Sequence, residues 1–190
     1  MSATSKPRLV GIAGSLRKNS YCSAVLSTLV DEIADQACLE IVSLDRLPFY
    51  NQDLDTDTPP SAVSDFRRAL LLADGIIIVS PEFNYGVPGV LKNAIDWASR
   101  PYGSSALTRK PVLTTTASPA FTGGVRAHVQ LSEALRACFA VVPARPEIVL
   151  GSIHEKIRDG LLEDRASIEF LLAGIDDLLG EISALHATQG

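Results

Sequence analysis

The stretch from Gly11 to Ser20, GIAGSLRKNS, holds the residues of this chain best suited to bind an anion. It places the hydroxyls of Ser15 and Ser20 on either side of the fixed positive charge of Arg17. A hydrogen bond to a charged group contributes roughly 1.5–3 kcal/mol, compared with roughly 0.3–2 kcal/mol for a helix dipole. These residue types therefore predict a phosphate site in which Arg17 and the two hydroxyls provide most of the binding free energy.

The spacing of the glycines excludes the two commonest phosphate loops. Gly11 and Gly14 are three residues apart and no third glycine follows, so the dinucleotide fingerprint GxGxxG is absent. No GK[ST] triplet occurs, so the stretch is not a Walker A loop. A ligand smaller than a dinucleotide, with a terminal phosphate, fits this stretch best. The alternative is an ordinary surface turn with an incidental arginine.

The elements on either side explain how this stretch would be held. Leu9–Ala13 is a short apolar run typical of a strand buried on both faces. Apolar residues recur at helical spacing from Val25 to Ile33, which predicts a helix that begins near Ser20. A helix that begins directly after such a turn points its free N–H groups into the turn, where an anion can accept from them.

Two further loops have the same placement. Pro81–Val87 follows the apolar, β-branched strand Gly75–Ser80, and Ala117–Gly124 follows the strand Pro111–Thr116. A helix is predicted after each loop, beginning at Pro88 and at about Val125. Because ligands of parallel sheets bind beyond the carboxyl ends of the strands, we expect all three loops to meet at one edge of the sheet.

The second and third loops suit a flat ligand. Phe83 and Tyr85 stand beside Gly86, and such rings pack well against a planar aromatic group, although they could simply cover the sheet edge. Gly123 and Gly124 allow a close approach of the backbone, although they could also form only a flexible connection. A phosphate at the first loop and a planar ring at the other two describe a mononucleotide such as FMN.

The remaining pattern defines the fold class. Strands alternate with helices, and no linker or repeat interrupts them, which predicts one domain over residues 1–190 with a doubly wound, five-stranded parallel sheet covered by helices on both faces. The other predicted elements are a strand at Leu39–Leu44, a helix with Ser61 as its N-cap, a helix at about Val125–Phe139, strand material at Ala140–Val142 and Ile148–Leu150, and a last helix that carries Ile168, Leu171, Leu172, Ile175, Leu179 and Ile182 on one face.

Composition excludes several classes of partner. The 190 residues carry a net charge of −5, which gives no support to binding of nucleic acid or of a membrane surface. No apolar run is long enough to span a bilayer, and the polar first residues lack the core of a signal peptide. Cys22, Cys38 and Cys138 are odd in number and far apart, as expected of reduced thiols. A cytoplasmic protein is expected.

No group of residues predicts covalent or metal chemistry. His128, His154 and His186 have no metal-ligand spacing and are each expected on a helix surface. Ser15 lacks the GxSxG context of a hydrolase nucleophile. Lys92 and Asp96 are one helical turn apart and are expected to form a surface ion pair. This absence fits an enzyme whose bound cofactor carries the chemistry, and no catalytic side chain is assigned.

Two motifs give the chain a family resemblance. The motif GSLRxxS, from Gly14 to Ser20, and the long motif PEFNYGVPGVLKNAIDW, from Pro81 to Trp97, strongly resemble the NAD(P)H-dependent FMN reductases. Within that family the chain looks most like the small flavodoxin-like quinone, azo-dye and chromate reductases. The resemblance implies a flavodoxin-like fold, bound FMN, NADPH or NADH as hydride donor, a small-molecule electron acceptor, and a homodimer or homotetramer with the flavin near the subunit interface.

The resemblance also implies which residues hold the cofactor. The phosphate would be held by Ser15, Arg17 and Ser20, and the ribityl chain and ring would be bordered by Pro81, Glu82, Phe83, Asn84, Tyr85 and Gly86, with Ser118, Gly123 and Gly124 on the other side. The family usually has asparagine where this chain has Cys22, so one polar contact could be missing. Two alternatives stay open: a flavin reductase that releases reduced FMN to a monooxygenase, and a non-enzymatic carrier like flavodoxin.

Overall fold

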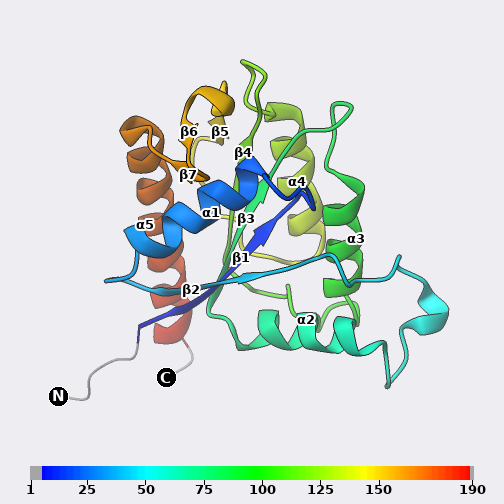
Figure 1. Ribbon diagram of the computed structural model, residues 1–190. Helices are drawn as coiled ribbons and strands as arrows, with labels where there is room; N and C mark the ends of the chain where they lie inside the picture. The colour runs from blue at the N-terminus through cyan, green and yellow to red at the C-terminus, as the bar shows by residue number, and fades with distance from the viewer. Residues whose placement is uncertain (1–5, 189–190) are drawn as a thin grey trace.

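A computed structural model describes residues 6–188 of the chain (Figure 1). Five parallel strands form the main sheet: β1 (Arg8–Ala13), β2 (Cys38–Val42), β3 (Gly75–Ser80), β4 (Val112–Ala117) and β5 (Ile148–Leu150). The α-helices are α1 (Tyr21–Glu32), α2 (Ser61–Leu72), α3 (Gly89–Ala98), α4 (Val125–Ala137) and α5 (Arg165–Ala187). Short 3-10 helices lie at Gln52–Leu54 and Ile153–Glu155, and a small hairpin joins β6 (Ile157–Arg158) to β7 (Leu161–Leu162).

The strand order β2-β1-β3-β4-β5 confirms the predicted doubly wound sheet. From β1 the chain moves outward to β2 and then returns across β1 to β3, so the order reverses between β1 and β3. This reversal is the topological switch point, where ligands of such sheets bind. The loops after β1, β3 and β4 all leave the carboxyl edge of the sheet beside that point.

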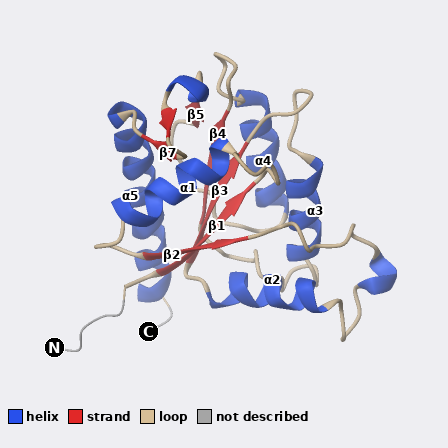
Figure 2. Cartoon of the chain, in the orientation of Figure 1, coloured by secondary structure: helices blue, strands red, loops and turns tan. Residues whose placement is uncertain are grey.

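The helices cover both faces of the sheet (Figure 2). On β3, Ile77 and Val79 pack with α1 and α5, while Ile76 and Ile78 pack with α2, α3 and α4. The period of two along a strand sends alternate side chains to opposite faces, so a run of β-branched residues fits a central strand with a core on each side. All six residues of β3 are buried, as the sequence predicts.

Two local predictions are wrong. Ser61 is the first residue of α2 and not its N-cap; Pro60 occupies the N-cap position in an extended conformation and has no side chain that could accept a hydrogen bond there. Ala140–Val142 is not a strand, because only Val141 forms an isolated bridge, to Pro111. Pro143 follows at once and cannot donate to a neighbouring strand. The sequence pattern does not predict the β6–β7 hairpin, because strands of two residues are too short to show an alternation of apolar and polar residues.

Candidate functional site

The first loop leaves β1 and lies directly against the second. The backbone N–H of Gly14 donates to the carbonyl oxygen of Val79 on β3, at 2.8 Å. A Cβ atom at Gly14 would lie 3.1 Å from both Leu91 and Pro81, which is tighter than ordinary van der Waals contact. Only glycine lets the two loops approach this closely.

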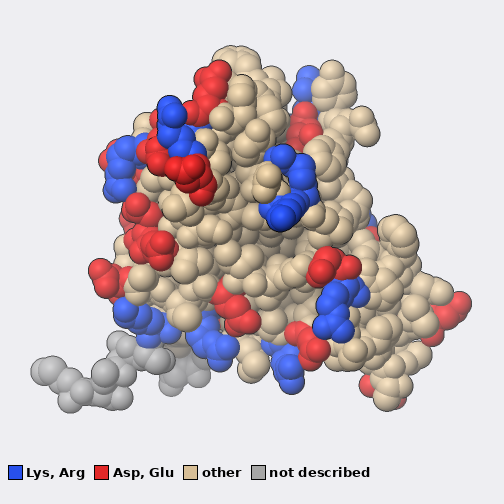
Figure 3. Space-filling model, viewed as in Figure 1, with Lys and Arg blue, Asp and Glu red and all other residues tan. Residues whose placement is uncertain are grey.

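Arg17 presents its positive charge to solvent. Its guanidinium lies 4.8 Å from the centroid of the Tyr21 ring, which holds the side chain over the start of α1. Among residues 6–188 no carboxylate lies within 4.0 Å of its nitrogens. Figure 3 shows basic atoms that stand amid uncharged surface over this loop, where both Arg17 and Lys18 are exposed. An anion at this loop would meet a guanidinium that no carboxylate in the described part of the chain neutralises.

The two serines of the first loop shape its backbone. The Ser20 Oγ accepts from the N–H of Ser23 at 3.4 Å and so caps α1, which begins next to Ser20 as the sequence predicts. The Ser15 Oγ accepts from the N–H of Arg17 at 3.3 Å. Both hydroxyls still have a hydrogen to donate. The first N–H groups of α1, at Tyr21 and its neighbour, have no carbonyl partner within the helix.

Cys22 packs into the core, where its thiol lies close to the Ser20 hydroxyl. Its side chain is 1% exposed among Val25, Leu26 and the strands of the α1 face. Burial raises the pKa of the Cys22 thiol to about 12, so it stays protonated at neutral pH. The thiol is therefore neither a nucleophile nor an anionic neighbour of the loop.

The second loop is a tight turn between Phe83 and Gly86. These two residues exchange backbone hydrogen bonds of 3.1 and 3.0 Å, and the residues between them, Asn84 and Tyr85, have φ angles of 51° and 64°. Positive φ at both central positions is typical of a type I′ turn, and it is costly for tyrosine. The turn presents its rings to solvent, with Phe83 56% and Tyr85 68% exposed.

The side chain of Glu82 points toward α4. Its carboxylate accepts from the backbone N–H of Ala127 at 3.0 Å and lies 3.9 Å from the guanidinium of Arg126. Only 10% of this side chain is exposed. Glu82 therefore links the second loop to the helix that follows the third loop.

The third loop is held by the segment after β5. Ser118 is buried; its N–H donates to Leu150 O, and its Oγ accepts from Ala120 N, both at 3.1 Å. Gly123 and Gly124 have φ angles of 66° and 88°, a region that favours glycine. A Cβ at Gly124 would lie 3.2 Å from the side chains of both Glu82 and Thr116.

Gly151 is a residue that sequence reasoning misses. It lies against the backbone of the third loop, so that an added Cβ would come 3.4 Å from the carbonyl oxygen of Ala120 and far closer to that of Phe121. The N–H of Ser152 also donates to Ala120 O, at 3.3 Å. A glycine after a short strand was the available signal, but nothing near it in the sequence points to the third loop.

The structure thus brings the predicted residues of all three loops to one edge of the sheet. The first loop contacts the second through Gly14, and the second contacts the third through Glu82 and Gly124. The arrangement offers a free cation and N–H donors at one end and exposed rings with glycine backbone at the other. These features fit a phosphorylated ligand with a flat ring, which is the chemistry of FMN.

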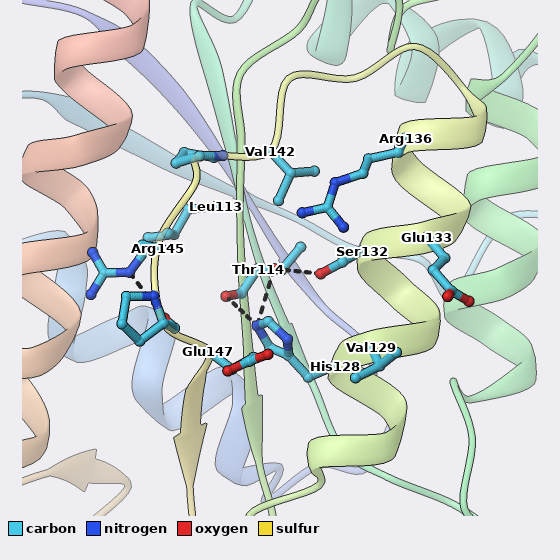
Figure 4. A pocket seen from close by; sticks show the side chains of 12 residues that line it. Leu113, Thr114, His128, Val129, Ser132, Glu133, Arg136, Val142, Arg145 and Glu147 are labelled. Atoms are coloured by element: carbon cyan, nitrogen blue, oxygen red, sulfur yellow. Dashed lines mark hydrogen bonds between the residues drawn. The ribbon is translucent and has the colours of Figure 1, made fainter.

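A separate cavity of about 170 Å³ lies between β4, α4 and the segment that connects α4 to β5 (Figure 4). It contains His128, whose predicted position on a helix surface is wrong: the side chain is buried, with Nε2 at 3.1 Å from the Thr114 carbonyl oxygen and 3.2 Å from its hydroxyl. Ser132 joins the same group, at 3.3 Å from Thr114. The spacing of residues along α4 does not reveal that Thr114, a polar residue on β4, faces His128.

Burial lowers the pKa of His128, and the charge of Arg136 acts in the same direction, against the opposing effects of the Thr114 carbonyl and Glu147. Below about pH 6.5 the unfolded chain takes up a proton that the folded protein still excludes, so the free energy of unfolding falls as the pH falls. We expect His128→Asn to flatten this part of the curve of unfolding free energy against pH, measured by urea denaturation from pH 7.5 to 5. Equal slopes for both proteins would contradict this expectation.

Other charged groups play ordinary surface roles. Lys92 and Asp96 form the predicted pair, at 2.5 Å on an exposed face of α3. His154 and His186 have exposed side chains, and His186 lies 3.3 Å from Asp74. Over residues 6–188 no three His, Cys, Asp or Glu side chains gather as metal ligands would.

Comparison with known proteins is consistent with this site. Residues 7–155 match the family described as NADPH-dependent FMN reductase. The chain is 38% identical to a quinone reductase of Pseudomonas putida, over 87% of this chain and 89% of that protein. It is 35% identical to an NAD(P)H-dependent FMN reductase of Pseudomonas aeruginosa, over 84% and 86% of the two chains. The solved structure of FerB, an NAD(P)H:(acceptor) oxidoreductase of Paracoccus denitrificans, superimposes with a TM-score of 0.80 at 29% identity, over 94% and 98% of the chains.

Proposed function

The chain belongs to the NADPH-dependent FMN reductase family, and we propose that it passes two electrons from NAD(P)H to quinones or similar small acceptors. It is a flavodoxin-like oxidoreductase that uses FMN with NAD(P)H as electron donor. Azo dyes and chromate are further candidate acceptors. The observation that carries the proposal is the meeting of three loops at the switch point, with Arg17 at one end and no carboxylate partner for it among residues 6–188.

We assign the cofactor site to those loops. Ser15, Arg17 and Ser20 would hold the phosphate, together with the first N–H groups of α1. The ribityl chain and ring would lie along the second and third loops, which contribute Pro81, Glu82, Phe83, Asn84, Tyr85, Gly86, Ser118, Gly123 and Gly124. The exposed rings of Phe83 and Tyr85 and the glycine backbone support this placement.

When bound, FMN supplies the redox chemistry by taking a hydride from NAD(P)H and giving two electrons to the acceptor. The chain's own residues bind and orient it. Backbone N–H groups of the second and third loops would stabilise negative charge that develops on the ring. No side chain of this chain is assigned as an acid or base.

Kinetics test this proposal. If NAD(P)+ leaves before the quinone binds in the same place, initial rates plotted reciprocally against quinone at several NAD(P)H concentrations will give parallel lines. We expect parallel lines and much faster turnover with a quinone than with free FMN. Intersecting lines would contradict a shared site for donor and acceptor. Faster turnover of free FMN would indicate a flavin reductase, and no NAD(P)H oxidation would indicate an electron carrier.

We also propose a homodimer or homotetramer in the cytoplasm. Phe49 and Phe121 are 88% and 92% exposed, and contact with a partner subunit would remove the apolar surface of these rings from water. Cys22, Cys38 and Cys138 are all unpaired thiols, as a reducing compartment favours. Within residues 6–188 no helix has both the length and the apolarity to cross a bilayer. Light scattering after size-exclusion chromatography tests the assembly.

A further inference from the structure

The residue at the N-cap position of helix α4 provides no side-chain acceptor for the first N–H groups of the helix. The N-cap position is Gly124, which has no side chain to accept a hydrogen bond and has a φ angle of 88°. A side chain at this position would also press against Glu82 and Thr116. The N–H of Val125 donates to the carbonyl oxygen of Thr122 at 3.3 Å, and the N–H groups that follow it in the first turn need an acceptor from outside the helix.

The missing acceptor comes from the second loop. The carboxylate of Glu82, 45 residues away in sequence, accepts from the N–H of Ala127, the third residue of α4. An N-cap side chain normally bonds the N–H of the second or third helical residue, so Glu82 performs the cap's role from another loop. The negative charge also lies at the positive end of the helix dipole, which adds to the stabilisation.

The same turn of α4 holds the rest of the second loop. The guanidinium of Arg126 lies 4.3 Å from the centroid of the Tyr85 ring. One helical turn on, Gln130 accepts from the N–H of Val87 at 3.2 Å and donates to the carbonyl oxygen of Tyr85 at 3.3 Å. These contacts bracket the strained turn, and Glu82 is the anchor at its base.

We propose that Glu82 is a positioning residue for the flavin: its side chain caps α4 and thereby fixes the second loop relative to the third. The inference rests on the proposed function, since it concerns the two loops assigned to the ring. In this role the Glu82 side chain sets the distance between the second and third loops and does not itself contact the ligand. Removing the carboxylate would free the start of α4 and let the loops separate.

The test compares three Glu82 variants in the full-length apoprotein, titrated with FMN and with riboflavin by fluorescence quenching. Glu82→Ala removes the acceptor and is expected to weaken the binding of both flavins equally, by about 5- to 30-fold, the upper part of the range that a lost cap implies. Glu82→Gln keeps an acceptor oxygen and should restore affinity to within about threefold of the wild type. Glu82→Asp, whose side chain is too short to reach Ala127, gives an intermediate loss and replaces the alanine variant if that does not fold.

Asp164 provides a matched control. Its carboxylate caps α5 by accepting from Ser167 N at 2.9 Å, with Lys156 at 3.7 Å, so it repeats the chemistry of Glu82 outside the three loops. Asp164→Ala should lower the melting temperature about as much as Glu82→Ala but leave both flavin affinities unchanged. Wild-type affinity in Glu82→Ala, no rescue by Gln, or an equal loss in Asp164→Ala would each overturn the inference. Failure of the wild type to bind FMN would overturn the proposed function instead.

Discussion

Arg17→Ala is expected to weaken FMN binding by about 10- to 150-fold, because one charge-assisted hydrogen-bonding partner contributes roughly 1.5–3 kcal/mol. Arg17 lies on the first loop, has no carboxylate within 4.0 Å in the described part of the chain, and faces solvent beside the first N–H groups of α1. The expected loss is large because the guanidinium is the strongest single donor among the three loops. The stability of the apoprotein should barely change, since the side chain is exposed.

Riboflavin isolates the phosphate contribution. It lacks the phosphate, so its dissociation constant should be the same for the wild type and Arg17→Ala, while that of FMN rises. Lys18→Ala is the matched control, because it removes a neighbouring exposed cation and should change FMN affinity only severalfold. If Arg17→Ala retained wild-type FMN affinity, or lost riboflavin affinity to the same extent, the phosphate would not lie at the first loop.

Gly151→Ala is expected to have the largest effect on stability, a loss of about 1–3 kcal/mol. The added methyl group would overlap the carbonyl oxygen of Phe121, which is backbone and cannot rotate away. The third loop must shift, and with it the hydrogen bonds that Ser118 and Ser152 make across it. A chain of this size would lose about 2–12 °C of melting temperature, and FMN affinity should fall as well.

Gly180→Ala separates this clash from the general effect of replacing a glycine. Gly180 is exposed on α5 and has no atom within 4 Å of an added Cβ, so alanine there should stabilise the protein by up to about 1 kcal/mol. Scanning calorimetry of both variants, with and without FMN, measures the difference. A melting temperature for Gly151→Ala equal to that of the wild type would show that the third loop yields without cost.

Much of the fold and of the site's location follows from local patterns in the sequence. The apolar run of β3, the start of α1 near Ser20 and the alternation of strands and helices each depend on neighbouring residues, and each is where the sequence predicts it. Parallel strands place their carboxyl ends at one edge, so the three loops had to meet there once the strand order was known.

The tertiary structure decided how side chains distant in the chain use one another. Helical spacing predicts His128 on a surface, yet its side chain is buried and its Nε2 pairs with the carbonyl oxygen of Thr114 on β4. Glu82 looked like a ligand contact, yet its carboxylate caps α4. The sequence around Gly151 does not point to the third loop, because the requirement for glycine there comes from the carbonyl oxygen of Phe121, 30 residues away. Periodicity and motifs describe what a residue's chain neighbours require, whereas caps, close approaches and buried polar pairs depend on packing between elements that only folding brings together.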